Sequence, residues 1–159
     1  MITLGLDPGL SATGYGSVVF DRGSLTLERC GVWRPPDRLP FAERLHFLFE
    51  SLAALLDELH PAAVSVETVF AAKNVSSAIK LSHARGVLLA AAARFDVPVF
   101  EYEPRLVKKA LVGYGQAEKP QVRAMVLALL ARQRDRVPLD AADALAVAIC
   151  HLHARPPGP

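Results

Sequence analysis

The chain has 159 residues, of which 52% are hydrophobic and 21% are charged, a composition that excludes a disordered chain and predicts one domain with a buried core. No apolar run approaches the roughly 18 to 20 residues of a membrane-spanning helix, and Cys30 and Cys150 lack the spacing of a zinc site. We therefore expect a cytoplasmic protein. Residues 1–154 are predicted to form the domain and residues 155–159 a disordered C-terminal tail.

Charge is distributed unevenly along the chain, whose formal net charge is +2. Residues 1–70 carry 5 basic and 9 acidic side chains, whereas residues 71–159 carry 13 basic and 7 acidic side chains. The second half therefore predicts a positive surface that would face a polyanion such as nucleic acid. A solvated basic face without a function is the alternative interpretation.

The beginning of the chain predicts an antiparallel meander of three strands. Residues 2–7 alternate between the two faces of a strand, and the turn signal Pro8-Gly9 ends it. Two more strands are expected over residues 13–20 and 25–33. The Asp-Arg-Gly sequence between them suits a short hairpin connection.

The remainder alternates between helices and strands. Apolar residues at helical spacing predict a helix from Phe41 that ends at His60-Pro61. The following elements are expected to be a strand over 62–70, a helix capped by Ser76 or Ser77, a strand over 97–102, and helices over 104–113, 119–131 and 140–153. The later strands need crossover connections, which parallel pairing requires. The sequence thus predicts an α/β fold, with a mixed sheet of about five strands flanked by helices.

Four carboxylates occupy the ends of predicted elements, where side chains can converge. Asp7 ends the first strand, Glu67 lies near the end of the fourth, and Asp140 and Asp143 share one face at the start of the last helix. Four carboxylates in one pocket would repel one another unless divalent cations neutralised them. Hard oxygen ligands without cysteine indicate Mg²⁺ or Mn²⁺.

Each carboxylate also has a structural interpretation. Asp7 suits a turn before Pro-Gly, and Asp140 and Asp143 suit an N-cap and a first-turn acid. Glu67 fits less easily, because an unpaired carboxylate is unfavourable in a strand that is covered on both faces. The pattern alone leaves both a metal site and helix capping open.

Six segments, in order along nearly the whole chain, form a distinctive set of motifs. They are Gly5-Leu-Asp7-Pro-Gly-Leu-Ser-Ala-Thr-Gly-Tyr-Gly16, Val66-Glu67-Thr-Val-Phe70-Ala-Ala-Lys73-Asn74, Ala84-Arg85-Gly86, Val99-Phe-Glu-Tyr102, Gly115-Gln-Ala-Glu118-Lys119 and Asp140-Ala-Ala-Asp143-Ala-Leu-Ala146. Together they resemble the RuvC family of Holliday junction resolvases. The resemblance implies an RNase H-like homodimer that resolves four-way (Holliday) DNA junctions by paired symmetric nicks in recombination and repair. It also implies two Mg²⁺ ions per active site, with Mn²⁺ as a substitute, hydrolysis to 5′-phosphate and 3′-hydroxyl ends, and a RuvA/RuvB branch-migration complex as partner.

The resemblance also assigns roles to individual residues. It makes Asp7, Glu67, Asp140 and Asp143 the catalytic metal ligands. It places Lys108 and Lys119 near the scissile phosphate and Phe70 among the bases of the junction, although lysines of this kind are ordinarily solvated and a lone Phe that closes a strand is ordinarily core. The further candidates for phosphate contacts, with the dimer interface as the alternative location for some of them, are Lys73, Lys80, Arg85, Lys109 and Arg123.

Three other functions are compatible with parts of the pattern. The Asp7-Pro-Gly loop also resembles that of actin-like ATPases, but that fold closes two such domains around a nucleotide and this chain has the length of one. A nucleic-acid-binding module without catalysis would need only the basic second half. A relaxed nuclease, such as a ribosomal RNA processing relative with the same fold, is the third. ATP turnover would indicate the first function, and metal-dependent cleavage would exclude the second.

Overall fold

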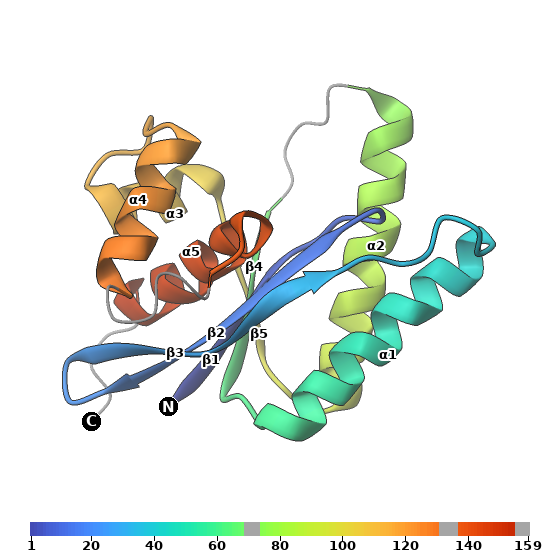
Figure 1. Cartoon of the computed structure of the whole chain (residues 1–159), viewed down its shortest axis with the longest axis horizontal. Helices are drawn as coiled ribbons and strands as arrows, with labels where there is room; N and C mark the ends of the chain where they lie inside the picture. Colours follow the sequence, from blue (N-terminus) through green and yellow to red (C-terminus); the bar gives the residue numbers. More distant parts are fainter. Residues whose placement is uncertain (69–73, 131–136, 155–159) are drawn as a thin grey trace.

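The computed structural model describes residues 1–68, 74–130 and 137–154. The five strands are β1 (Ile2–Asp7), β2 (Thr13–Asp21), β3 (Ser24–Trp33), β4 (Ala63–Glu67) and β5 (Val99–Tyr102). The five helices are α1 (Phe41–Leu59), α2 (Val75–Arg94), α3 (Pro104–Val112), α4 (Lys119–Leu129) and α5 (Leu139–Ala154) (Figure 1). None of the helices in these described ranges is long and apolar enough to cross a membrane.

The five strands form one mixed sheet in the order β3-β2-β1-β4-β5. β1 pairs antiparallel with β2 and parallel with β4, and β4 pairs parallel with β5. Arg22 and Gly23, with φ of 48° and 81°, form the turn between β2 and β3, as a two-residue hairpin connection requires. The predicted meander followed by parallel strands is confirmed.

Some element ends differ from the prediction. The N-cap of α2 is Asn74 rather than Ser76 or Ser77, because the extended Asn74 side chain accepts a hydrogen bond from the backbone N–H of Ser77 at 2.8 Å. In the described residues, β4 begins at Ala63 and β5 at Val99, later than expected, and the two strands pair from Val64 opposite Val99 to Glu67 opposite Tyr102. Residues 69 and 70 of the expected fourth strand lie outside the described ranges. The helix predicted from residue 140 begins one residue earlier.

The helices cover both faces of the sheet. α1 and α2 pack on one face, and α5 lies across the other with α3 and α4 outside it (Figure 1). Within β1, Leu4 and Leu6 are buried in the cluster that includes α1 and α2. Alternation of side chains along the strand therefore turns Gly5 and Asp7 toward α5.

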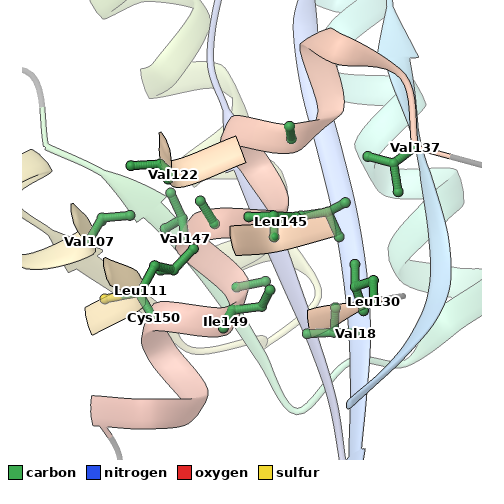
Figure 2. Close-up of a cluster of buried hydrophobic side chains, with 14 of the residues drawn as sticks. Val18, Val107, Leu111, Val122, Leu130, Val137, Leu145, Val147, Ile149 and Cys150 are labelled. Atoms are coloured by element: carbon green, nitrogen blue, oxygen red, sulfur yellow. The ribbon is translucent and has the colours of Figure 1, made fainter. Parts of the chain in front are cut away.

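The helix α5 approaches the sheet closely because glycines and alanines lie between them. A Cβ atom added at Gly5 would lie 1.9 Å from the carbonyl oxygen of Ala144, closer than any side chain allows. The other face of α5 completes the core, where the side chains of Val107, Leu111 and Val122 gather around it (Figure 2). This packing holds the first turn of α5 over the ends of the central strands.

Candidate active site

Two of the four carboxylates end neighbouring parallel strands. Asp7 is the last residue of β1 and Glu67 is the last residue of β4. The register of the two strands pairs the residues immediately before them, Leu6 and Val66. The carboxyl groups therefore emerge side by side, on the face of the sheet that α5 covers.

The other two carboxylates come from the start of α5. A Cβ atom added at Gly14 would lie 2.2 Å from the carbonyl oxygen of Asp140, and Gly14 is the residue of β2 that pairs with Asp7. The first turn of α5 thus rests almost on the backbone of β2, next to Asp7. Asp143 follows Asp140 by three positions and lies on the same side of the helix.

Two adjoining cavities share Asp7, Lys119 and Asp143 in their walls. The larger, of about 850 Å³, is also lined by Asp140, while the smaller, of about 70 Å³, is also lined by Glu67. The structure therefore brings all four predicted carboxylates to one connected region, although 136 positions separate Asp7 from Asp143 in the sequence.

Two of these carboxylates bind basic side chains of the protein. The Nζ atom of Lys119 donates a hydrogen bond to Oδ2 of Asp143 at 2.9 Å, and a guanidinium nitrogen of Arg34 donates to Oδ2 of Asp140 at 2.5 Å. In the described ranges, no three His, Cys, Asp or Glu side chains stand in an arrangement that would by itself hold a metal ion. Asp140 and Asp143 must release these partners before both of their oxygens can serve as ligands.

Burial and mutual repulsion raise the pKa values of the two strand-end carboxyl groups, Asp7 and Glu67. Burial first, and then the charges of Asp143 and Asp140, raise the pKa of Asp7 from 3.8 to about 6, although Lys119 partly offsets this. Burial, followed by the charges of Asp7 and Asp143, also raises the pKa of Glu67. Both shifts indicate excess negative charge in a partly desolvated region.

A divalent cation suits this region chemically. All four candidate ligands are carboxylates, which are the hard oxygen donors that Mg²⁺ and Mn²⁺ prefer. A cation would also offset the repulsion from Asp143 and Asp140 that, after burial, raises the pKa of Asp7. The donor set and its electrostatics thus fit the expected metal ion.

The basic residues that the sequence singled out occupy different places. Lys119 and Lys108 line the smaller cavity with Glu67, and Arg123 lines the larger one. The hydrogen bond to Asp143, more than any other interaction, raises the pKa of Lys119, so its ammonium stays charged. Lys109 is exposed on α3, one position from Lys108.

Other predicted DNA contacts lie away from the carboxylates or outside the described residues. Lys80 is exposed on α2, in the opposite helical layer. Arg85, also on α2, forms an ion pair with Glu101 of β5 at 2.7 Å, so part of its charge is already neutralised. Phe70 and Lys73 fall within residues 69–73, outside the described ranges, and their roles stay predictions.

Arg34, which lies in the acidic first half of the chain, was not among the residues predicted from the sequence. The strand pairing of the predicted meander could have located Arg34. The register pairs Trp33 with Thr13 and Gly14 with Asp7, so the residue after Trp33 emerges at the same edge as Asp7. Strand order together with the hairpin turn would have placed Arg34 beside the acidic residues.

Comparisons with known proteins identify the family of the chain. A family model described as Crossover junction endodeoxyribonuclease RuvC matches residues 3–151. The RuvC proteins of Desulfitobacterium hafniense and Solidesulfovibrio magneticus are 44% and 49% identical to the chain, each over 97% of it and over 93% and 90% of their own lengths.

Solved structures give the same result. A Thermus thermophilus RuvC structure has a TM-score of 0.87 and 33% identity, covering 96% of this chain and 94% of the other. T. thermophilus RuvC in complex with Holliday junction substrate has a TM-score of 0.89 and 34% identity, covering 96% of this chain and 93% of the other. The chain has the RNase H-like fold of these proteins and belongs to the RuvC family of crossover junction endodeoxyribonucleases.

Proposed function

We propose that this protein is a structure-selective endonuclease that resolves four-way DNA junctions in recombination and repair. The observation that carries the proposal is the convergence of Asp7, Glu67, Asp140 and Asp143 around two adjoining cavities, in a chain of the RuvC family. The structure of a relative with a Holliday junction substrate supports the choice of DNA. The acidic residues supply the chemistry that a simple DNA-binding module lacks.

In this proposal the four carboxylates hold two Mg²⁺ ions, for which Mn²⁺ substitutes. The ions would supply activation of the attacking water and stabilisation of the leaving oxygen during phosphodiester hydrolysis. Water forms the new bond to phosphorus, and the bond from phosphorus to the 3′ oxygen breaks. The products are a 5′-phosphate and a 3′-hydroxyl, which a ligase can rejoin.

Lys119 and Lys108 are proposed to stabilise charge on the reacting phosphate. Both line the cavity that contains Asp7 and Glu67. Lys119 is 81% exposed at its side chain, so it can turn from Asp143 toward a bound phosphate without breaking the core. A positive group held at this position counts most in the transition state, where negative charge on the phosphoryl oxygens is redistributed.

The remaining parts of the proposal concern assembly and location. Two symmetric nicks call for two active sites related by a two-fold axis, which a homodimer provides. Family membership supports a RuvA/RuvB branch-migration complex as partner, and a cytoplasmic location suits that work. We propose residues 1–154 as one nuclease domain and residues 155–159 as a disordered tail. Those last five residues lie outside the described ranges.

Cleavage of a synthetic junction tests this function. The protein is incubated with Mg²⁺ and a four-way junction labelled on one strand at a time, and the products are resolved on a denaturing gel. Paired nicks at symmetric positions, with linear duplex of the same sequence left intact, would support the proposal. Equal cutting of the linear duplex would indicate a relaxed nuclease, and binding without any cutting would indicate a DNA-binding module.

A further inference from the structure

Arg34 is the side chain whose position the proposed function leaves unexplained. It follows the last residue of β3 and lines the larger cavity together with Asp7, Asp140 and Asp143. Its guanidinium forms an ion pair with Asp140, 106 positions away in the sequence. An arginine that is paired with one oxygen of a proposed metal ligand must move before both oxygens of that ligand can bind a cation.

The ion pair between Arg34 and Asp140 contributes little to the stability of the fold, so either group can change partner at little cost to the fold. The side chains of Arg34 and Asp140 are 59% and 55% exposed, and ion pairs between exposed groups contribute little to stability. A divalent cation would offer Asp140 a stronger partner than one guanidinium. Its arrival would release the guanidinium of Arg34 from Asp140.

The residues that line the larger cavity indicate which group would replace Asp140 as the partner of Arg34. Its wall on α4 combines Arg123 with the apolar side chains of Pro120, Ala124 and Leu127. Two guanidiniums from separate elements, beside an apolar surface, suit the phosphates and sugars of a nucleic acid strand. The planar fork of arginine also matches two phosphate oxygens at once.

We propose that Arg34 exchanges anions during the reaction cycle: it neutralises Asp140 in the empty site and binds a backbone phosphate once the cation and the DNA are present. The exchange couples the two ligands. The cation releases Arg34 for the DNA, and the DNA removes the competitor of the cation, so each binds more tightly when the other is present. This inference rests on the proposed function, because it needs a DNA strand in the larger cavity.

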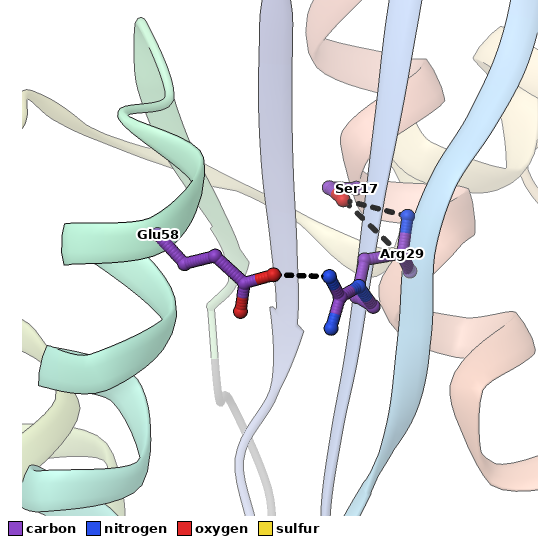
Figure 3. Close-up of polar contacts among 3 residues, drawn as sticks. All are labelled: Ser17, Arg29 and Glu58. Atoms are coloured by element: carbon purple, nitrogen blue, oxygen red, sulfur yellow. Dashed lines mark hydrogen bonds and ion pairs between the residues drawn. The ribbon is translucent and has the colours of Figure 1, made fainter.

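Arg34→Gln tests the exchange, and Arg29→Gln is a matched control. Arg29 lies on β3, five positions before Arg34, and forms an ion pair with Glu58 of α1 (Figure 3). That pair is 47% and 53% exposed, much like the pair of Arg34. Arg29 lines neither of the two cavities, so its removal changes the net charge of the protein without touching the site.

Two binding measurements are needed, and neither depends on catalysis. The first is the affinity of the DNA-free protein for Mn²⁺, measured by calorimetry. We expect Arg34→Gln to bind Mn²⁺ about two- to fivefold more tightly than the wild type, because a competing cation has gone. The second is the affinity for a four-way junction in saturating Ca²⁺, measured over a range of salt concentrations.

In the second measurement, Arg34→Gln should bind the junction more weakly, with a salt dependence whose log-log slope is smaller by about 0.9, the value for one lost phosphate contact. Arg34→Lys should keep the slope, since it keeps the charge. Arg29→Gln should match the wild type in both measurements. If Arg34→Gln matches Arg29→Gln in either measurement while the wild type still cleaves junctions, the exchange is wrong and the proposed function stands. A wild type that neither binds nor cleaves the junction would overturn both.

Discussion

The ammonium of Lys119 lies 2.9 Å from Oδ2 of Asp143, at the boundary that the two cavities of the site share. The pair joins the first residue of α4 to the start of α5. It places a positive charge near three carboxylates, Asp143, Asp7 and Glu67. We therefore expect the loss of Lys119 to have a large effect on the cleavage rate and a small effect on the stability of the fold.

Replacing Lys119 by Gln should reduce cleavage strongly and stability little. The loss of one preorganised positive group near a reacting phosphate typically lowers the rate by about 100- to 1,000-fold. The exposed ion pair itself is worth only about 0 to 1 kcal/mol. Single-turnover cleavage at saturating protein measures the rate, and thermal unfolding measures stability. Arg94→Gln, at the exposed end of α2, is the control, and equal rates for the two variants would contradict the role of Lys119.

Replacing Asp7 by Asn should stabilise the metal-free protein at neutral and higher pH. The pKa of Asp7 is raised from 3.8 to about 6 in the folded state, so the folded protein holds this proton more tightly than the unfolded chain does. The stability that the proton provides is complete below pH 3.8 and is lost as the pH rises through about 6. The unionisable Asn avoids that loss, which amounts to about 3 kcal/mol at most.

Urea unfolding in a chelator measures this difference. The gain from Asp7→Asn should be largest at about pH 8 and should vanish below about pH 4. Asp57→Asn, an exposed position on α1, changes the net charge equally and is the control. A gain for Asp7→Asn that stays constant across this range would show that repulsion and burial of the charge are not its cause.

Divalent cations should stabilise the wild type, and Glu67→Gln should lose most of that effect. A ligand that binds only the folded state adds about 2.7 kcal/mol at a concentration of 100 times its Kd. Glu67 lines the smaller cavity with Asp7 and Asp143, so its removal weakens the shared site. Thermal unfolding with Mg²⁺ and with chelator gives the difference. Glu43→Gln, exposed on α1, should behave as the wild type, and an undiminished Mg²⁺ effect in Glu67→Gln would remove Glu67 from the ligand set.

Gly14→Ala should destabilise the protein and impair the site. The new Cβ atom would meet the carbonyl oxygen of Asp140 at 2.2 Å, so the first turn of α5 must move away from the sheet. Forced overpacking of this kind costs about 1 to 3 kcal/mol. Gly86→Ala is the contrasting control, because its Cβ would have nothing within 4 Å and alanine is the better helix former by about 1 kcal/mol. A loss of stability in both variants would contradict the explanation by close helix approach.

Phe70→Ala distinguishes a residue that stacks on junction bases from a core residue. Stacking on a base is worth about 1 to 3 kcal/mol, so junction cleavage should fall sharply while the melting temperature hardly changes. Loss of a core Phe would instead destabilise the fold by about 3 to 5 kcal/mol. Phe49→Ala, on α1 and packed against the core, should show that second behaviour. A large drop in melting temperature for Phe70→Ala with cleavage intact would show that Phe70 is a core residue and does not stack on bases.

The sequence predicted the meander, the mixed sheet and the four carboxylates because these follow local rules. Alternation and turn residues defined β1 to β3, and the need for crossovers made β4 and β5 parallel. Strand ends and a helix start then pointed to Asp7, Glu67, Asp140 and Asp143. The N-cap Asn74 was missed because three polar residues compete there within four positions. Only the side-chain bond to the Ser77 N–H distinguishes it.

The roles of the basic residues could not be read from local pattern. Arg85 is a predicted candidate for a phosphate contact, with the dimer interface as the alternative, and that role stays a prediction. The structure adds an ion pair with Glu101 between α2 and β5, and neither segment of sequence indicates this contact. Arg34 was not predicted to lie at the site because its region of the chain is acidic overall. The folded meander nevertheless places its side chain against Asp140. Partners of long, exposed side chains depend on tertiary packing, which sequence periodicity does not encode.

Single-turnover cleavage of a four-way junction by Asp7→Asn, measured beside its binding of the same junction, separates chemistry from DNA binding. In the proposed function the carboxylates perform the chemistry while phosphate contacts hold the DNA, and these are separate contributions. We expect cleavage to be abolished while the junction Kd stays close to that of the wild type. Cleavage by Asp7→Asn at the wild-type rate would show that Asp7 does not take part in the chemistry.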